Sequence, residues 1–351
     1  MPVRLFPHFS MEFIHDLTGI DFGDQYFHDA ELHHRQDIVL HKALHSFCLQ
    51  WWPEAAEGFS KEPPYTVGVG QAFIIMSALF GSTIRYFSNF HPDCTPEPLA
   101  GVTEPGEIRV PDPASTWPVS EYLEEYDRLS ALHGRDRVSL PGFGSAAMFT
   151  PSLQGLSMHS PLTTAYRLRG LELFVDMSER PAMARRIFDV IRETSYRLFD
   201  LMIARLGLRT DLMFFAACCS SLVSERIWRE WELPAMKEIA GHYGAKVAIH
   251  SCGRSTHILE PAAEIEGLVE LHPGGETDLR LARKHLPGVG LVVIPDSVRL
   301  SRASPEEAVA VIRGILEAGT PGTLGIQFAM EAGIRPETIV AVREAVASWE
   351  E

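Results

Sequence analysis

Short apolar runs alternate with longer amphipathic stretches over the second half of the chain. A run of four to eight apolar residues is typical of a buried strand, whereas apolar residues that recur every three or four positions indicate one buried face of a helix. The pattern predicts strands at 138–143, 211–217, 246–250, 267–272, 289–295 and 324–329, with helices at 161–174 and 178–206 among them. Short strands that alternate with helices favour a parallel α/β fold, and a TIM (β/α)8 barrel fits this count best.

Capping residues mark the ends of several of these helices. The helix expected at 178–206 begins at Ser178 and ends at Gly207. A later helix begins at Ser304, and Glu307 follows three residues after it, which is the spacing of a capping box. These signals indicate where the chain leaves each helix and returns to the sheet.

The first third of the chain is less regular. Residues 1–64 mix a histidine-rich helical stretch with irregular segments, so we expect an N-terminal extension packed on a barrel that spans 65–351. Residues 92–118 are rich in proline and acidic side chains and are expected to form a loop, because proline removes a backbone donor and disfavours helix before it. The longest apolar stretch, 67–80, is too short to cross a bilayer and predicts a buried helix.

The acidic composition narrows the choice of partners. The chain has 351 residues and a formal net charge of -15. Without a basic block to displace counterions from phosphates, binding to nucleic acid or to an anionic membrane is not expected. The five cysteines are sparse and odd in number, and the N-terminus does not resemble a secretory signal. We therefore expect a reducing, cytoplasmic setting, in which thiols act as ligands, nucleophiles or core residues.

The strongest chemical signal is the tetrapeptide His250-Ser251-Cys252-Gly253, which ends the strand expected at 246–250. Side chains alternate along a strand, so His250 and Cys252 project to the same side and form a plausible half of a zinc site. In a TIM barrel the chemistry lies at the carboxyl ends of the strands. Other soft or acidic side chains follow expected strands as well: Cys218, Cys219, His272, Asp296 and Glu331.

These residues carry a resemblance to a known family. The stretch 217–254 resembles the uroporphyrinogen decarboxylase superfamily, in particular its branch of corrinoid-linked methyltransferases and their uncharacterised relatives. The similar elements are Leu222-Val223-Ser224-Glu225, an aromatic-rich helix that contains Pro234, and the His-Ser-Cys-Gly block. Weaker similarity, upstream at Ser160-Pro161-Leu162 and downstream at Ser304-Pro305-Glu306, extends the resemblance to roughly residues 65–345.

The resemblance implies a TIM barrel with a site at its carboxyl end. In the methyltransferase branch, zinc bound by His-x-Cys and a later cysteine activates a thiol, which accepts a methyl group from a corrinoid on a partner protein. This chain departs from that pattern, because the segment after its last strand, 328–334, contains no cysteine. The missing ligand would be replaced by Glu331, or by Cys218 or Cys219 from the neighbouring strand. The expected metal site is therefore His250, Cys252, one of the two adjacent cysteines, and Glu331 as a further candidate.

Four residues are assigned to substrate binding at the same edge: His159, Arg254, His272 and Asp296. Each candidate also has a structural interpretation. His159 and His272 would be hydrogen-bonded structural histidines, Cys218 and Cys219 small buried residues, and Glu331 a carboxylate near a helix start. A second group of histidines would be a solvated helix surface in preference to a second metal site: His28, His33, His34, His41 and His45.

Three functional classes follow. The first is a zinc-dependent methyltransferase that moves a methyl group between a corrinoid protein and a small thiol or other acceptor. The second is a decarboxylase or lyase that acts on a small or tetrapyrrole-like substrate in the same cavity. The third is a catalytically reduced paralogue that binds a ligand or partner, an alternative that the missing cysteine makes more plausible.

Overall fold

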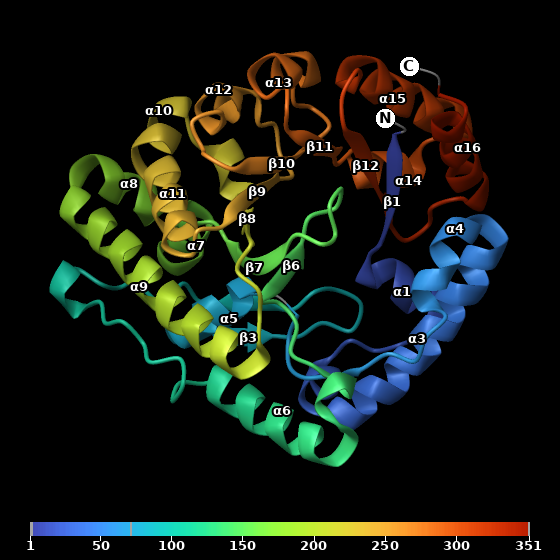
Figure 1. Ribbon diagram of the computed structural model, residues 1–351. Coiled ribbons are helices and arrows are strands. Elements are labelled where there is room, and N and C mark those ends of the chain that lie inside the picture. The colour runs from blue at the N-terminus through green and yellow to red at the C-terminus, as the bar shows by residue number, and fades with distance from the viewer. Residues whose placement is uncertain (1–2, 71, 350–351) are drawn as a thin grey trace.

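A curled eight-stranded sheet forms the centre of the molecule in the computed structural model, which describes residues 3–70 and 72–349, and helices cover its outer side (Figure 1). All neighbouring strands pair in parallel except β6, which is antiparallel to β7. The order across the sheet is β1 (Arg4–Phe9), β12 (Leu324–Met330), β11 (Gly290–Val293), β10 (Leu268–Pro273), β9 (Lys246–Ser251), β8 (Leu212–Ala216), β7 (Gln154–His159) and β6 (Gly144–Ala146). The five strands expected after residue 210 are all present.

The sheet does not close into the expected barrel. Its edges are β1 and β6, and no ladder joins them among the described residues. Two short strands, β2 (Tyr65–Thr66) and β5 (Val138–Ser139), pair with each other in a separate parallel sheet, and β3 (Thr83–Arg85) pairs with β4 (Asp93–Thr95). The strands of these two small sheets pair only with each other, so they do not link β1 to β6. The α/β fold is therefore a curled half-barrel.

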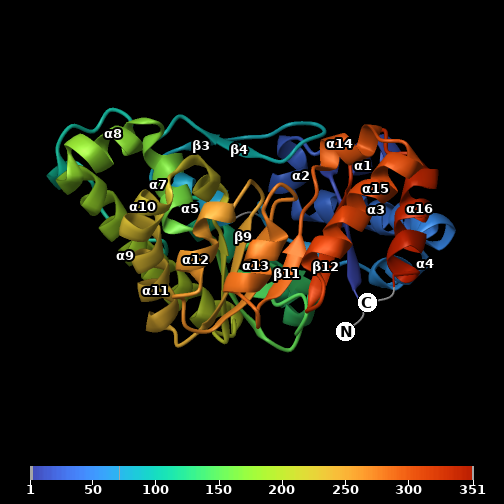
Figure 2. The same cartoon turned by 90° about the horizontal axis from the view of Figure 1, so that it is seen from above.

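The helices lie around the outside of the sheet and over its ends (Figures 1 and 2). Their bounds are α1 (Met11–Thr18), α2 (Asp24–His28), α3 (Ala30–Trp51), α4 (Pro53–Ala56), α5 (Ala72–Leu79), α6 (Val119–His133), α7 (Pro161–Arg169), α8 (Glu172–Glu179), α9 (Pro181–Leu206), α10 (Glu225–Ile227), α11 (Leu233–His242), α12 (Leu259–Ala262), α13 (Leu279–His285), α14 (Ser297–Arg302), α15 (Pro305–Gly319) and α16 (Pro336–Ala347). In the described part of the chain, no helix has the length and apolar character needed to span a bilayer.

The expected helix ends are partly confirmed. Ser304 and Glu307 form the capping box at the start of α15: the Glu307 amide donates to Ser304 Oγ at 3.2 Å, and the Ser304 amide donates to Glu307 Oε2 at 2.8 Å. The helix expected at 161–174 instead breaks at Gly170, whose φ of 68° ends α7. The separate helix α8 then occupies the residues around Ser178, so α9 begins three residues later than expected, at Pro181.

The N-terminal histidines are only partly on the surface. His33 and His34 are buried on α3, where His33 packs on the Tyr26 ring and His34 on the Tyr65 ring, with both pairs of ring centroids 3.9 Å apart. The expectation of a solvated helix face is therefore wrong for these two residues. It failed because Tyr26 and Tyr65 come from other segments of the chain and cover this face of α3.

Candidate metal centre and adjoining pocket

Three histidines lie at the same level on the carboxyl side of the sheet. His159, at the end of β7, is in register with Ala216 of β8, which is in register with His250 of β9, and His250 is in register with His272 of β10. Residues in register on neighbouring parallel strands point to the same side of a sheet. The ring centroids of His250 and His272 are 6.2 Å apart. The sheet therefore gathers imidazole groups from three strands on one side.

Two cysteines join His250 at this edge. Cys252 follows β9 directly, and Cys218 begins η4 (Cys218–Leu222), the short 3-10 turn after β8. One ligand atom from each of Cys218, His250 and Cys252 lies within 4.8 Å of the other two. The Ala217 amide donates to the His250 carbonyl at 2.6 Å, which attaches the turn to β9. Among the described residues, this is the group of three side chains that is arranged to hold a metal ion.

The two thiols of this group differ in protonation. Hydrogen bonds from the Cys218 thiol and then from His250 lower the pKa of Cys252 to about 4, which outweighs the effect of burial. The pKa of Cys218 is raised, first by its hydrogen bond to Cys252 and then by burial. In the metal-free protein these opposite shifts favour a Cys218 thiol that donates to a Cys252 thiolate, and a bound metal ion would displace the Cys218 proton. Thiolate and imidazole are the donor types that zinc prefers, so these residues fit the ion.

Cys219 is not among the three grouped ligands, and its contacts belong to the support behind them. Its side chain is buried, and burial raises the pKa of the Cys219 thiol to about 11. The Cys219 amide donates to Thr163 Oγ1 at 3.2 Å, and Ser160 Oγ donates to the same hydroxyl at 3.0 Å. Of the two adjacent cysteines, Cys218 is therefore the one that the fold brings to His250.

A buried carboxyl group extends this support. Glu232 lies in η5 (Trp228–Glu232), a π-helical turn, and its Oε2 accepts from the Leu162 amide at 2.7 Å at the start of α7. Burial raises the pKa of Glu232 to about 7. Thr163 and Glu232 were not predicted from the sequence, because nothing in their local pattern shows that α7 lies against the turn that carries Cys218.

Glu331 lies outside the group of three. It follows β12 and interacts electrostatically with His8, near the end of β1, and with His91. Burial lowers the pKa of both histidines, while Glu331 acts in the opposite direction. His8 and His91 were not among the residues predicted from the sequence. The one available signal was that His8 lies near the end of an N-terminal strand, which was not among the expected strands.

His159 and His272 are held in their neutral forms. Burial lowers the pKa of His159 to about 3, and His250 adds to the effect. Burial also lowers the pKa of His272, although Glu270 opposes this from a distance of 3.3 Å between His272 Nε2 and Glu270 Oε2. The Glu270 carboxylate also accepts from the amides of Met148 and Phe149, at 2.9 and 2.8 Å. His272 is thus tied to a buried hydrogen-bonded group.

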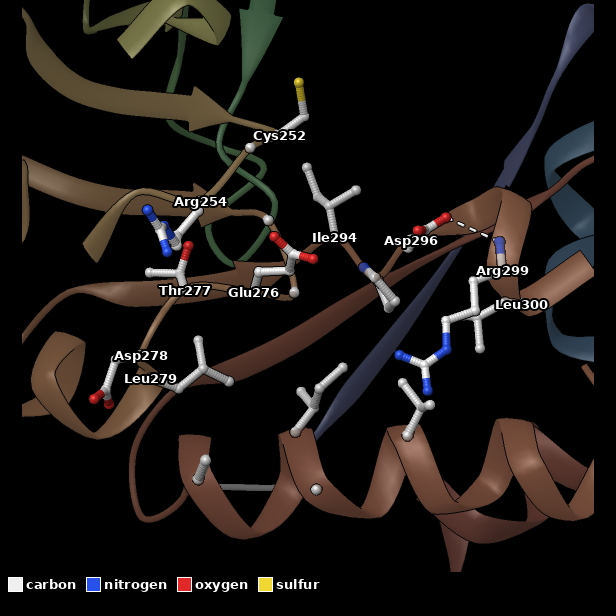
Figure 3. Close-up of a pocket in the computed structure, with 18 of the residues that line it drawn as sticks. Cys252, Arg254, Glu276, Thr277, Asp278, Leu279, Ile294, Asp296, Arg299 and Leu300 are labelled. Carbon is white, nitrogen blue, oxygen red and sulfur yellow. Dashed lines mark hydrogen bonds between the residues drawn. The ribbon is translucent and has the colours of Figure 1, made fainter. Parts of the chain in front are cut away.

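A cavity of about 790 Å³ adjoins Cys252. Its lining comes from the segments after β9, β10 and β11 and from one side of α15. Arg254 and Asp296 both line it, and Figure 3 shows Cys252 at one end of the group of lining residues. The Asp296 carboxylate caps α14 by accepting from the Arg299 amide at 2.9 Å. The cavity brings two of the four expected substrate-binding residues together, whereas His159 and His272 lie with His250 at the strand ends.

Comparisons with known proteins agree with this architecture. The family model described as uroporphyrinogen decarboxylase (URO-D) matches residues 153–349, more than half of the chain. No curated protein matches the sequence. A solved structure described as a methyltransferase from Methanosarcina mazei is similar with a TM-score of 0.64 and 16% identity, over 99% of this chain and 93% of that one.

Two further solved structures show partial similarity. A B12-independent methionine synthase from Shewanella sp. W3-18-1, in complex with selenomethionine, has a TM-score of 0.36 at 13% identity, over 54% of this chain and 60% of that one. A putative vitamin-B12 independent methionine synthase from Listeria monocytogenes has a TM-score of 0.37 at 14% identity, over 56% and 64%. At 16% identity, the similarity to the Methanosarcina protein shows a shared fold alone. Because the family model matches more than half of the chain, the chain belongs to the uroporphyrinogen decarboxylase family.

Proposed function

We propose that this protein is a zinc-dependent methyltransferase that moves a methyl group between a corrinoid, carried by a partner protein, and a small thiol acceptor. The observation that carries the proposal is the convergence of Cys218, His250 and Cys252, whose ligand atoms lie within 4.8 Å of one another. Three protein ligands leave one position of a tetrahedral site for a substrate, which is the arrangement of catalytic zinc. Cys218 takes the place of the cysteine that is missing after the last strand.

The side chains of this chain would act by binding and orienting. Cys218, His250 and Cys252 would hold the zinc ion, and Thr163 would fix the turn that carries Cys218 through the Cys219 amide. Bound zinc supplies positive charge that favours the thiolate form of an acceptor thiol near neutral pH. The neutral rings of His159 and His272 would line the space beside His250, and the cavity with Arg254 and Asp296 would receive the acceptor.

The reaction itself exchanges one bond for another. The acceptor sulfur forms a new bond to the methyl carbon while the cobalt–carbon bond of the donor breaks. The cobalt keeps the electron pair of that bond, and the proton of the acceptor thiol passes to solvent. Positioning of the two reactants is the main contribution expected of the protein.

Metal analysis of the purified protein tests the first half of the proposal. We expect about one equivalent of zinc per chain after reconstitution and dialysis, and loss of that zinc in His250→Ala. Cys219→Ala is the matched control, since this neighbouring cysteine is not one of the three grouped ligands. Absence of stoichiometric metal from both the wild type and the control would overturn the zinc site.

Methyl transfer is tested with free methylcobalamin under anaerobic conditions. The absorption spectrum should change from that of methylcobalamin to that of the demethylated corrinoid when zinc-loaded protein and a thiol are both present, and methylated thiol should accumulate in equal amount. His250→Ala should give neither signal. Stoichiometric zinc with no transfer across a broad panel of thiols would favour a decarboxylase, a lyase or a ligand-binding paralogue instead.

A further inference from the structure

We propose that Cys218 and Cys252 form a redox switch, in which a peroxide such as hydrogen peroxide joins their two sulfur atoms in a reversible disulfide. The pairing rests on the structure of the two turns that carry these cysteines. That the disulfide also displaces a metal ion rests on the proposed function. Three features support the pairing: the register of β8 and β9, the close contact between the two turns, and the different exposure of the two sulfurs.

The register of β8 and β9 places the two cysteines opposite each other. Ala216 pairs with His250 in the parallel ladder, and each cysteine follows its paired residue by two positions. The Ala217 amide donates to the His250 carbonyl at 2.6 Å, so the two chains stay side by side beyond the ladder. Neighbouring strands lie about 4.7–4.9 Å apart, within the Cα separations of about 4.4–6.8 Å that disulfides span. The two sulfur atoms themselves lie within 4.8 Å of each other.

The turns that carry the two cysteines are held firmly against each other. An added Cβ at Gly253 would lie 2.7 Å from both the Cβ and the Oγ of Ser221, so a larger residue would push the turns apart. From the segment after Cys252, His257 Nε2 lies 2.9 Å from the Ser220 carbonyl oxygen. The sulfur atoms can therefore meet through rotation of their side chains, without a rearrangement of the backbone.

The two sulfurs differ in their access to solvent. Cys252 is exposed, whereas Cys218 is half-buried. The Cys252 sulfur is turned away from Arg254 and Glu276, which line the adjoining cavity (Figure 3). A small peroxide in solution therefore meets Cys252 first, and Cys218 is in place to react with the product.

The remaining three cysteines are poorly placed to compete. Cys48 and Cys219 are buried, and Cys94 lies in β4, where its thiol donates to the Ile74 carbonyl at 3.3 Å. Cys219 is adjacent to Cys218 in the chain but is not among the three grouped ligands. The structure therefore predicts one specific disulfide.

The reaction balances with peroxide as the oxidant. The Cys252 sulfur attacks one peroxide oxygen, the O–O bond breaks, and the departing oxygen takes up the thiol proton and leaves as water. Cys252 is then a sulfenic acid. The Cys218 sulfur attacks the Cys252 sulfur, the S–O bond breaks, and the hydroxyl group leaves as a second water with the Cys218 proton. In total, two thiols lose two electrons and two protons, and one hydrogen peroxide becomes two waters.

Oxidation would remove both sulfur ligands of the proposed zinc site in one step. A sulfur in a disulfide is no longer a thiolate, which is the form that binds a metal. His250 alone would remain of the three grouped ligands, so the metal would be released. Reduction of the disulfide by a thiol would restore both ligands, which makes the switch reversible.

Mass spectrometry of metal-free protein tests the pairing. After treatment with a small excess of hydrogen peroxide, trypsin should release a linked pair of peptides, 210–226 and 247–254, which separates on reduction. Because the first peptide contains both adjacent cysteines, two variants assign the link. Cys219→Ser should keep the linked pair within about twofold of the wild-type amount, and Cys218→Ser should lower it at least about tenfold.

A trapped intermediate keeps this test independent of the yield of disulfide. In Cys218→Ser, the Cys252 sulfenic acid has no partner and should accumulate, so dimedone should label it more strongly than in the wild type. A link that persists in Cys218→Ser, or one that disappears in Cys219→Ser, would overturn the pairing. Wild-type protein that gives no link at all would overturn it as well.

Zinc-loaded protein tests the effect on the metal. A chromophoric chelator should detect zinc release at the rate at which the linked peptides form, and reduction followed by added zinc should restore the metal content. Cys94→Ser is the matched control and should release zinc as the wild type does, because Cys94 lies outside the group. Protein that forms the disulfide when metal-free but resists peroxide when zinc-loaded would overturn the switch.

The outcomes also separate this inference from the proposed function. Protein that binds zinc and transfers methyl groups but forms no disulfide between Cys218 and Cys252 would overturn the switch alone. Protein that forms this disulfide but binds no zinc would overturn the methyltransferase proposal, and the pairing of the two thiols would stand.

Discussion

Two parts of the carboxyl edge of the sheet differ in their chemistry. Beside β8 and β9, Cys218, His250 and Cys252 place two sulfur atoms and one imidazole nitrogen within 4.8 Å of one another. Beside β12 and β1, the corresponding side chains are Glu331 and His8, which interact electrostatically but do not join that group. The sulfur ligands therefore lie on the β8–β9 side, whereas the β12–β1 side has a carboxylate and an imidazole.

Under the proposed function, this difference would let a metal site form without one of the ligands that the family resemblance implies. The family resemblance implies that the last thiolate ligand comes from the segment after the final strand. In this chain that segment contains no cysteine. Cys218 follows β8, which is four strands away from β12 in the sheet. It lies next to β9 because the Ala217 amide, just before η4, donates to the His250 carbonyl. We thus expect metal affinity to depend on the β8–β9 side alone.

The largest expected effect comes from removing a ligand on the β8–β9 side. Cys252→Ala and Cys218→Ala should each lower zinc affinity by more than about 100-fold, since even residues that only hydrogen-bond to a metal ligand commonly contribute 10- to 100-fold. Competition with a chromophoric chelator measures the change. Retention of wild-type affinity in Cys218→Ala would mean that the replacement ligand comes from elsewhere, and the comparison between the two sides would fail.

A smaller effect is expected from the support behind Cys218. Thr163→Val keeps the shape of the side chain but leaves the buried Cys219 amide without its acceptor, which should cost about 1–3 kcal/mol of unfolding free energy. Zinc affinity should fall about tenfold as the turn loosens. Urea unfolding and chelator competition measure the two effects.

Thr164→Val is the control for this variant. The Thr164 hydroxyl is buried on the same helix but donates to the His159 carbonyl at 3.1 Å instead of supporting the turn. It should lower stability without a comparable loss of zinc affinity. Equal losses of affinity in the two variants would show that α7 acts only through general stability.

The lowered pKa of Cys252 predicts a modest increase in its reactivity toward alkylating agents, with a pH dependence that differs from that of an ordinary thiol. Its pKa is about 4 in the folded protein against an ordinary value of 9.0, so the fold favours the thiolate between these two pH values. In metal-free protein, alkylation of Cys252 by iodoacetamide should stay nearly constant from pH 8 to pH 6 and decline only as the pH falls toward 4. At pH 6 the rate should be roughly fivefold that of an ordinary thiol, because the larger thiolate fraction is partly offset by lower nucleophilicity.

Peptide mapping by mass spectrometry measures this reaction at each cysteine. Protein unfolded in urea provides the reference, since its thiols should lose reactivity below pH 9. Cys218→Ala removes the principal hydrogen bond to Cys252 and should shift the decline to higher pH. A folded protein whose Cys252 follows the unfolded profile would contradict the proposed thiol–thiolate pair.

The smallest effect is expected on the β12–β1 side. Glu331→Gln should change zinc affinity by less than about twofold, because Glu331 is not among the three grouped ligands. The same chelator competition measures it, with Cys252→Ala as the reference for a true ligand. A loss comparable to that of Cys252→Ala would restore Glu331 as a ligand and show that the two sides of the edge act together.

Much of the second half of the fold could be predicted from the sequence. The five strands after residue 210 were found, because each is an apolar run bounded by turn residues, and the capping box was readable from Ser304 and Glu307. The separate α8 and the start of α9 at Pro181 were missed. Gly170 was the signal for this break, because its φ of 68° suits the end of a helix.

The candidate site was only half predictable. The spacing of His250 and Cys252 on one strand is a local property, so the sequence indicated that pair directly. The choice between Cys218 and Cys219 depends on the Thr163 hydroxyl, which lies more than 50 residues earlier in the chain. The same is true of Glu232 and of His8, whose contacts join segments that no local pattern connects.

The sequence by itself determined the α/β class, the strand that ends in His250 and Cys252, and the absence of a cysteine after β12. These are local properties, set by the period of apolar residues and by side-chain alternation along a strand. The tertiary structure decided that the sheet is a curled half-barrel, that Cys218 is the sulfur next to Cys252, and that a cavity adjoins Cys252. These features depend on which distant segments pack together, because burial and hydrogen bonding across the sheet fix the direction of each side chain.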